Sequence, residues 1–280
     1  MPLQLDLVAA VLLAALLHAL WNSFVKVGRD RLASIVVISA MGGLLSLPLA
    51  TVVPLPAAAS VPFLAGSVVT HLVYYYFLVN AYRFGDLSRV YPLARGLAPP
   101  VVAVGAALVA GEWLQPREVG GIVLVSCGIA SLIAGSHGAD DRRSLWFAAA
   151  TGGMIAIYTV IDGLGARHAG QALSYIASMN LLESTAVVCV ARLRRGSSLW
   201  SAVRADLLRG VLAGAMATLG YGIVIYAMSR GGMAHVSALR ETSVVIAALI
   251  GTVVLGEPGV ARRVAAAMIV AAGVIVMNWR

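Results

Sequence analysis

The segment AYRFGDLSRVYPLARGLAPPVVAVGAALVAGEWLQPREVGGIVLVSCGIAS, residues 81–131, occurs a second time in edited form at residues 227–278. Each copy predicts an apolar helix with an arginine near its start, a Gly-Glu turn and a second apolar helix. In a hydrophobic chain, such a duplication is typical of transporters built from two repeats. A shift of 145 residues (240 minus 95) places Arg95 on Arg240, Gly111 on Gly256, Glu112 on Glu257, Arg117 on Arg262 and Gly128 on Gly273.

The composition indicates a membrane protein. Of 280 residues, 60% are hydrophobic and 11% are charged, and the mean hydropathy is +0.92. A soluble domain with a single apolar core does not have this composition, so we expect a multi-pass membrane protein. The net charge of +8 comes from short basic clusters between apolar runs, which favours a role in membrane orientation over nucleic-acid binding. Cys127 and Cys189 lie inside apolar runs and are expected to be small buried side chains.

Apolar runs of about 20 residues predict an all-α fold with ten transmembrane helices. No Lys or Arg precedes Lys26, which argues against a cleaved signal peptide and makes the first run a helix. Pro54, Pro56 and Pro62 break the long apolar stretch that begins at Leu32. The expected helices are about 7–25, 32–53, 61–82, 87–110, 116–135, 145–165, 171–191, 210–229, 234–255 and 260–279.

Three polar residues lie near the end of the first expected helix. His18 and Asn22 are four residues apart and Trp21 is three from His18, so all three share one helical face. Two interpretations follow. The group is either an interfacial anchor with a hydrogen-bonded histidine or part of the lining of a substrate cavity.

Further candidates for substrate contact lie on the third and sixth expected helices. The third carries His71 and three consecutive tyrosines that include Tyr75, and the sixth carries Tyr158; ordinary packing is the alternative. Glu183 is a carboxylate in the middle of the seventh helix, where an unpaired charge is expensive. It is therefore the candidate proton-coupling or countercharge residue, expected either to titrate near neutral pH or to pair with an arginine, and a purely structural ion pair is the alternative.

Arg95 lies in an otherwise apolar run with Pro99 and Pro100. The two prolines lack the N–H groups that would bond the carbonyls of Arg95 and Gly96, so two backbone acceptors are freed. In lipid such a break is tolerated only against protein or a water-filled cavity, so this helix is expected to be broken and to face inward. In the second copy Val244 replaces Pro99, so that helix need not be broken.

The two arginines of the repeat predict different roles. Each arginine near the middle of a span costs about 2.5–3.5 kcal/mol and persists only if it is paired or hydrated. Arg240 has acidic candidates in Glu241 and Glu183, whereas Arg95 has Gly96 at the position of Glu241. We therefore expect a structural ion pair at Arg240 and a free cation at Arg95 that binds an anionic group of the substrate. Solvation of Arg95 by carbonyls and water is the alternative.

The glutamates of the two Gly-Glu turns, Glu112 and Glu257, follow Gly111 and Gly256 at helix ends. A carboxylate there can accept bonds from unpaired N–H groups and interacts favourably with the positive end of a helix dipole. We therefore predict a structural role for both, rather than catalysis or ion coupling.

Two stretches are similar to a known family. APPVVAVGAALVAGEWLQPREVGGIVLVSCGIA, residues 98–130, combines prolines, an apolar run, Gly-Glu and a glycine-containing helix, and HALWNSFVK occupies residues 18–26. Together with the paired turns, they resemble the EamA family of the drug/metabolite transporter superfamily over nearly the whole chain. The resemblance implies two inverted five-helix repeats, 1–138 and 139–280, around a central cavity. It also implies transport of small metabolites, often export, across the cell membrane, which is the inner membrane in a bacterium.

The expected function is a permease that exports amino acids or related small polar metabolites by alternating access. Its expected partners are a small-molecule substrate and the lipid bilayer, with no nucleic acid and no cofactor. The alternative is an intramembrane enzyme or flippase-like protein that acts on a lipid-linked substrate.

One motif belongs to an enzyme class. DGLGAR, residues 162–167, fits the start of the Asp-Gly-x-x-Ala-Arg signature of CDP-alcohol phosphotransferases, which need several aspartates to hold a metal. Thr159 occupies the upstream position and no aspartate occurs between Asp162 and Asp206. A single carboxylate makes a poor magnesium site, so we interpret the match as chance. The five histidines are scattered and no metal or nucleophile motif is present in the sequence.

The basic residues predict the orientation of the chain. Of the twenty Lys and Arg, fourteen lie on the side of the odd-numbered links and four lie on the other side. The positive-inside rule then places both termini outside the cytoplasm, although members of the EamA family are often drawn with both inside. A C-terminal fusion to a fluorescent protein that matures only in the cytoplasm should stay dark, and bright cells would reverse the assignment. The fourteen are Lys26, Arg29, Arg31, Arg83, Arg89, Arg142, Arg143, Arg192, Arg194, Arg195, Arg204, Arg209, Arg262 and Arg263, and the four are Arg117, Arg167, Arg230 and Arg280.

Overall fold

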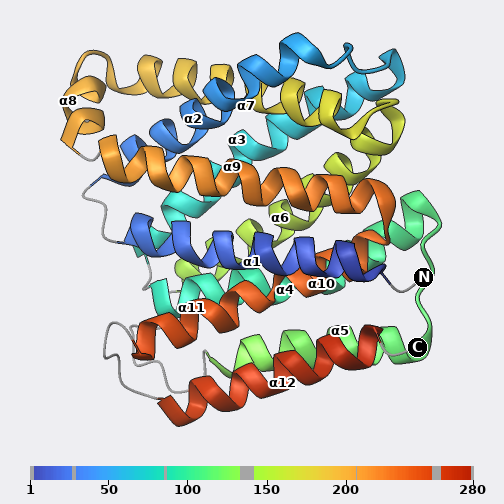
Figure 1. The fold of residues 1–280 in the computed structure, drawn as a ribbon. Helices are drawn as coiled ribbons and strands as arrows, with labels where there is room; N and C mark the ends of the chain where they lie inside the picture. Colours follow the sequence, from blue (N-terminus) through green and yellow to red (C-terminus); the bar gives the residue numbers. More distant parts are fainter. Residues whose placement is uncertain are drawn as a thin grey trace.

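The computed structural model describes residues 3–26, 30–84, 87–132, 142–205, 207–253 and 260–278, and every regular element in these ranges is a helix. Figure 1 shows the helices packed side by side as one bundle, with both termini at the same end and α8 at the opposite end. The helices are α1 (Leu5–Lys26), α2 (Arg31–Val52), the short 3₁₀ helix η1 (Ala58–Ser60), α3 (Val61–Phe84), α4 (Leu87–Ala110), α5 (Pro116–Ser131), α6 (Arg142–His168), α7 (Ala172–Arg195), α8 (Ser198–Ala205), α9 (Leu207–Arg230), α10 (Met233–Arg240), α11 (Thr242–Val253) and α12 (Val260–Asn278).

Helix length and surface chemistry both fit a bilayer. Within the described ranges, eight helices are long and apolar enough to cross a membrane, namely α1, α2, α3, α4, α6, α7, α9 and α12. Large apolar side chains cover the outside of the bundle, including Leu108 and Leu193, which are 73% and 86% exposed. A surface of this kind suits lipid, which also requires every backbone polar group to be bonded within a helix. Helices α5, α10 and α11 have 16, 8 and 12 residues, so the count of ten spans remains a prediction.

The proline-rich helix is not the one that breaks. The expected interruption of α4 is absent, since α4 continues through Pro99 and Pro100, and the second copy divides instead into α10 and α11 at Glu241. There the N–H of Glu241 bonds the carbonyl of Ala238 at 3.1 Å, and the N–H of Val244 bonds the carbonyl of Glu241 at 2.9 Å. These bonds between residues three apart tighten the chain locally. The Glu241 side chain takes part in a contact with α4, which the sequence of this helix alone does not reveal.

Two smaller expectations are also corrected. Part of the polar segment between α7 and α9 forms the short helix α8, whose Leu199 and Val203 are buried. Cys127 and Cys189 are exposed rather than buried, because they lie on outward faces of α5 and α7. An apolar run in a membrane helix therefore does not reveal which of its residues face lipid and which face protein.

The helices pack in pairs that join the two halves of the chain. α2 packs against α7, α5 against α12 and α4 against α10, while α3 lies on α6 and α1 on α9. Figure 1 shows α5 and α12 together along one edge of the bundle and α1 beside α9. The two halves are therefore interleaved and share one core.

Glycines bring α5 and α12 into close contact. A Cβ atom added at Gly121 would lie 2.7 Å from the carbonyl oxygen of Gly273, and one added at Gly128 would lie 3.1 Å from that of Ala266. The partner number falls by seven (273 to 266) as the α5 number rises by seven (121 to 128), so the helices are antiparallel. Small residues at such positions let two backbones approach closely in a membrane.

This contact predicts a position-specific effect of a single methyl group. Gly121→Ala is expected to lower the free energy of unfolding by about 1–3 kcal/mol, because backbone atoms of α12 must move to admit the methyl group. Gly120→Ala is the matched control, since nothing lies within 4 Å of a Cβ at Gly120. Thermal unfolding of the purified protein in detergent compares the two. Equal unfolding midpoints for both variants would contradict the packing.

Candidate functional site

A buried ion pair joins α4 to the junction of α10 and α11. Nη2 of Arg95 lies 2.7 Å from Oε1 of Glu241, and Nε of Arg95 donates a hydrogen bond of 2.9 Å to Oε2. The side chains are 3% and 0% exposed. The contact combines one charge-assisted hydrogen bond with a second close approach of opposite charges, and charge-assisted bonds are stronger than neutral ones.

The pairing corrects the sequence-based prediction for the two arginines. Arg240 was expected to pair with Glu241 or Glu183 and Arg95 to be free, but Glu241 binds Arg95. Consecutive residues of a helix do not face each other, so Glu241 reaches across to α4 rather than back to its neighbour. Arg240 is therefore the arginine that Glu241 does not bind.

Arg240 lies against an aromatic ring. Its guanidinium carbon is 5.8 Å from the ring centre of Tyr221, within the range of a cation–π interaction. The Arg240 side chain is 3% exposed, and its Nε–H has no hydrogen-bond acceptor among the residues that the structure describes. Arg240 therefore keeps a buried N–H donor to which no carboxylate is fixed.

Asp162 lies on the other side of the same tyrosine. The hydroxyl of Tyr221 donates to Oδ2 of Asp162 at 2.5 Å, and the hydroxyl of Tyr175 donates to Oδ1 at 2.9 Å. Asp162 is 0% exposed. Tyr221 thus separates a buried cation from a buried carboxylate, with its ring toward Arg240 and its hydroxyl on Asp162.

The ring of Tyr221 belongs to a group of aromatic rings from three helices, α3, α6 and α9. The ring of His71 stacks on that of Tyr158, with centroids 4.2 Å apart, and the ring of Tyr221 lies 5.9 Å and 5.7 Å from these two. Tyr74 lies edge-on to Tyr158 at 5.5 Å. We call His71, Tyr74, Tyr158 and Tyr221 the aromatic cluster. It brings together two predicted site residues, His71 and Tyr158.

The predicted residues of α1 contact one another. Nε1 of Trp21 donates to Nδ1 of His18 at 3.1 Å, and Nδ2 of Asn22 donates to the carbonyl of His18 at 2.8 Å. His18 is also close enough to Arg95 and Arg240 to interact with both electrostatically. The structure therefore brings Trp21 and Asn22 together with His18 on one face of α1.

Tyr75 and Glu183 form a separate contact between α3 and α7. The Tyr75 hydroxyl donates to Oε1 of Glu183 at 2.6 Å, and Glu183 is 9% exposed. In the described part of the chain, the bonded partner of Glu183 is thus a phenol and not one of the arginines proposed from the sequence. Tyr75 joins the aromatic cluster only through Tyr74, whose ring lies 5.1 Å away.

Glu112 connects the two halves of the chain at the end that holds the termini. Its Oε1 lies 2.5 Å from Nη2 of Arg167, and its Oε2 accepts the N–H of Met233, the first residue of α10, at 2.8 Å. Arg167 also donates to the carbonyls of Met228 and Gly231 at 3.0 and 2.7 Å. We call Glu112 and Arg167 the latch, because together they hold the α9–α10 link.

The carboxylate of Glu112 lies at the positive end of a helix dipole, but the helix is α10 and not the following α5. Gly111 supports this turn with a φ of +67°, a conformation that glycine adopts without strain. The equivalent residues of the second copy, Gly256 and Glu257, lie outside the described residues.

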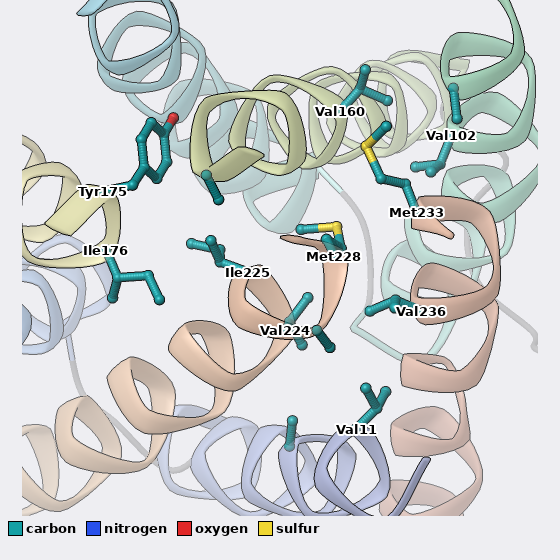
Figure 2. Close-up of a cluster of buried hydrophobic side chains, with 14 of the residues drawn as sticks. Val11, Val102, Val160, Tyr175, Ile176, Val224, Ile225, Met228, Met233 and Val236 are labelled. Atoms are coloured by element: carbon teal, nitrogen blue, oxygen red, sulfur yellow. The ribbon is translucent and has the colours of Figure 1, made fainter. Parts of the chain in front are cut away.

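A layer of apolar side chains lies behind the latch. Figure 2 shows Val11, Val102, Val160, Tyr175 and Met233 of this layer, which come from α1, α4, α6, α7 and α10 and belong to one buried cluster. Each residue lies on the part of its helix between the aromatic cluster and the end that holds the termini. The layer and the latch therefore both lie toward that end of the bundle.

Comparison with known proteins identifies the class. Residues 142–279 match the EamA-like transporter family. The chain belongs to this family. One solved crystal structure superposes on it with a TM-score of 0.72 at 21% sequence identity, over 96% of this chain and 95% of that chain. At this identity the likeness shows the fold alone, and no curated protein is detectably similar in sequence.

Members of the EamA family are membrane transporters rather than enzymes. Sequence reasoning missed Asp162, Tyr175 and Tyr221. One signal was available: a shift of 146 residues (221 minus 75) places Tyr221 on Tyr75, the tyrosine that bonds the other buried carboxylate. Asp162 was noticed only within a motif attributed to chance.

Proposed function

We propose that this EamA protein is a cell-membrane permease that exports amino acids or related small polar metabolites by alternating access. The observation that carries the proposal is the arrangement of Arg240 and Asp162 on either side of Tyr221. Buried ionisable groups inside membrane helices are expensive and mark substrate or ion pathways. In this protein one buried cation and one buried anion lie beside a cluster of aromatic rings.

The chemistry of the cluster suits a zwitterion. The donor of Arg240 without an acceptor can bind a carboxylate, and the faces of Tyr158, Tyr221 and Tyr74 can hold an ammonium group by cation–π attraction. Asp162 supplies the opposite charge at the same end of the cluster. Arg95 is neutralised by Glu241 and is proposed to position Glu241 and the α10–α11 break rather than to bind substrate.

Ten spans in two inverted five-helix repeats, 1–138 and 139–280, are proposed for the architecture. The packing of α5 against α12 supports a two-fold symmetry relation between the repeats. The repeat shift of 145 carries Gly121 to position 266 and Gly128 to position 273, and the observed contacts are Gly121 with Gly273 and Gly128 with Ala266. A contact that maps onto itself when the two partners are exchanged is the mark of a two-fold relation. Inverted repeats of this kind support alternating access by rocking around a central site.

Contacts near one end of the bundle further support alternating access. The apolar layer of Figure 2 packs toward the end that holds the termini, and the latch joins the two halves of the chain there. We propose that this end opens when Glu112 and Arg167 separate and the apolar layer parts. Substrate then leaves the aromatic cluster on that side.

Glu183 is proposed as the residue that couples a proton or countercharge to transport. Among the described residues its bonded partner is Tyr75 and not a cation. Because this hydrogen bond joins α3 to α7, a change in the charge of Glu183 would alter the contact between these two helices. Glu183→Gln is the test. Unchanged transport under every imposed pH gradient would eliminate the coupling role.

The function is tested with purified protein in liposomes. Labelled amino acids are expected to cross the bilayer unaltered, and the corresponding amines and carboxylic acids, which lack one charged group, are expected to compete poorly. Chromatography of the label separates the proposal from the enzyme alternative, because an enzyme acting on a lipid-linked substrate would change the compound. Equal competition by the amine, the acid and the amino acid would remove the zwitterion assignment.

A further inference from the structure

A groove on the outside of the bundle has no part in the proposed transport site. It encloses about 450 Å³ between α2, α7, α8 and α9, which lies in the size range of small-ligand pockets. Its walls are apolar except for Arg192, which lies at the last turn of α7. A groove with apolar walls and a cationic rim has the two-part chemistry of a site for an anionic amphiphile.

The groove follows the length of one leaflet. Val36, Ala40 and Leu44 of α2 line it and lie four residues apart, so they form one stripe along the helix. From Val36 to Leu44 the stripe rises about 12 Å, close to the roughly 15 Å of hydrocarbon in one leaflet. The dimensions therefore match one acyl chain aligned with the helices.

The rim lies at the level of the headgroups. α8 is a short helix with Leu199 and Val203 buried against the bundle, while Trp200 is 54% exposed and lines the groove. An amphipathic helix with a tryptophan is characteristic of the membrane–water interface. Arg192 lies at the same end of the bundle as α8 and is exposed there.

A neighbouring arginine is already engaged by protein. Arg195 forms an ion pair with Asp30, the N-cap of α2. Burial alone would raise the pKa of Asp30, but the hydrogen bonds from Arg195 and from the N–H of Ala33 hold that pKa below its ordinary value. Asp30 therefore remains a carboxylate at neutral pH and occupies Arg195, whereas Arg192 lines the groove itself.

We propose that this groove binds one anionic phospholipid, with an acyl chain along the α2 stripe and the phosphate on Arg192. The charge at the rim selects the headgroup and the apolar walls select the chain. Basic residues at the cytoplasmic face attract anionic lipids in the same way, and this end of the bundle also carries the arginine-rich links.

Native mass spectrometry of the intact protein in detergent tests the proposal with phosphatidylglycerol and phosphatidylcholine of identical acyl chains. Wild type is expected to bind one phosphatidylglycerol more tightly than phosphatidylcholine. Arg192→Gln should weaken phosphatidylglycerol about fivefold and phosphatidylcholine less, so that the preference between the two lipids is lost. The matched control is Arg194→Gln, which removes the same charge two residues away at a position that does not line the groove, and it should retain the preference. Equal binding of the two lipids by wild type, or equal losses in both variants, would overturn the site.

A second measurement locates the lipid without relying on charge. Phosphatidylglycerol with brominated acyl chains should quench Trp200, and the quenched component should disappear in Trp200→Phe although the other tryptophans remain. Ala40→Phe, which narrows the groove, should reduce this quenching for both headgroups. Persistence of the full quenching in Ala40→Phe would place the lipid elsewhere. The protein could instead form dimers without lipid, and Ala40→Phe could dissociate them. The groove would then be an interface between two copies of the chain, which would also overturn the proposal.

Discussion

Arg240→Ala is expected to weaken amino-acid transport strongly while leaving a folded protein. The substitution removes the buried donor proposed to bind the substrate carboxylate. A charge-assisted hydrogen bond contributes about 1.5–3 kcal/mol, so apparent affinity should fall about 10- to 100-fold. The fold should persist, because Arg240 holds no carboxylate in the described structure and a buried arginine itself costs about 2.5–3.5 kcal/mol in a membrane. Uptake into proteoliposomes and thermal unfolding are measured on the same preparation.

Two further variants sharpen this prediction. Arg240→Lys keeps the charge but loses the planar fork, so it should recover part of the transport rate. Arg230→Ala removes an exposed arginine at the end of α9 that contacts only Tyr226 among the described contacts, and it should transport as wild type does. Full activity of Arg240→Ala on zwitterionic substrates would end the assignment.

Glu241→Gln is expected to cause the largest loss of stability. It removes the carboxylate that binds Arg95, so the buried Arg95 guanidinium loses its bonded partner. Breaking a buried pair from one side costs about 3–5 kcal/mol, a large share of a typical stability of about 5–15 kcal/mol. The yield of monodisperse protein and the unfolding midpoint should both fall sharply.

The double variant Arg95→Met/Glu241→Gln provides the control. It removes the stranded cation together with the carboxylate, and replacement of both partners of a buried pair is often neutral. Most of the lost stability should return. A Glu241→Gln protein as stable as wild type, or a double variant less stable than the single one, would show that the Arg95–Glu241 contact does not hold α4 to the α10–α11 junction.

The helices were predictable to a large degree because each depends on local chemistry. Runs of apolar residues must form helices in lipid, and the prolines between Val53 and Pro62 end α2 and begin α3 close to the expected positions. The buried position of Arg95 and Arg240 also followed from their place within apolar runs. Which residues meet was not predictable, because a partner depends on how helices that are distant in sequence pack together.

The sequence by itself determined that this protein is helical, membrane-embedded and similar to a transporter family, since hydropathy and the Gly-Glu turns are properties of short segments. The tertiary structure decided which arginine is paired. Glu241 is adjacent to Arg240 in the chain, yet successive residues of a helix point in different directions, so Glu241 reaches Arg95 on α4. The same packing brought Tyr221 between Arg240 and Asp162 and placed Glu112 on the first turn of α10. The sequence therefore identified the charged residues of the site, but the packing of the helices decided which of them pair with each other.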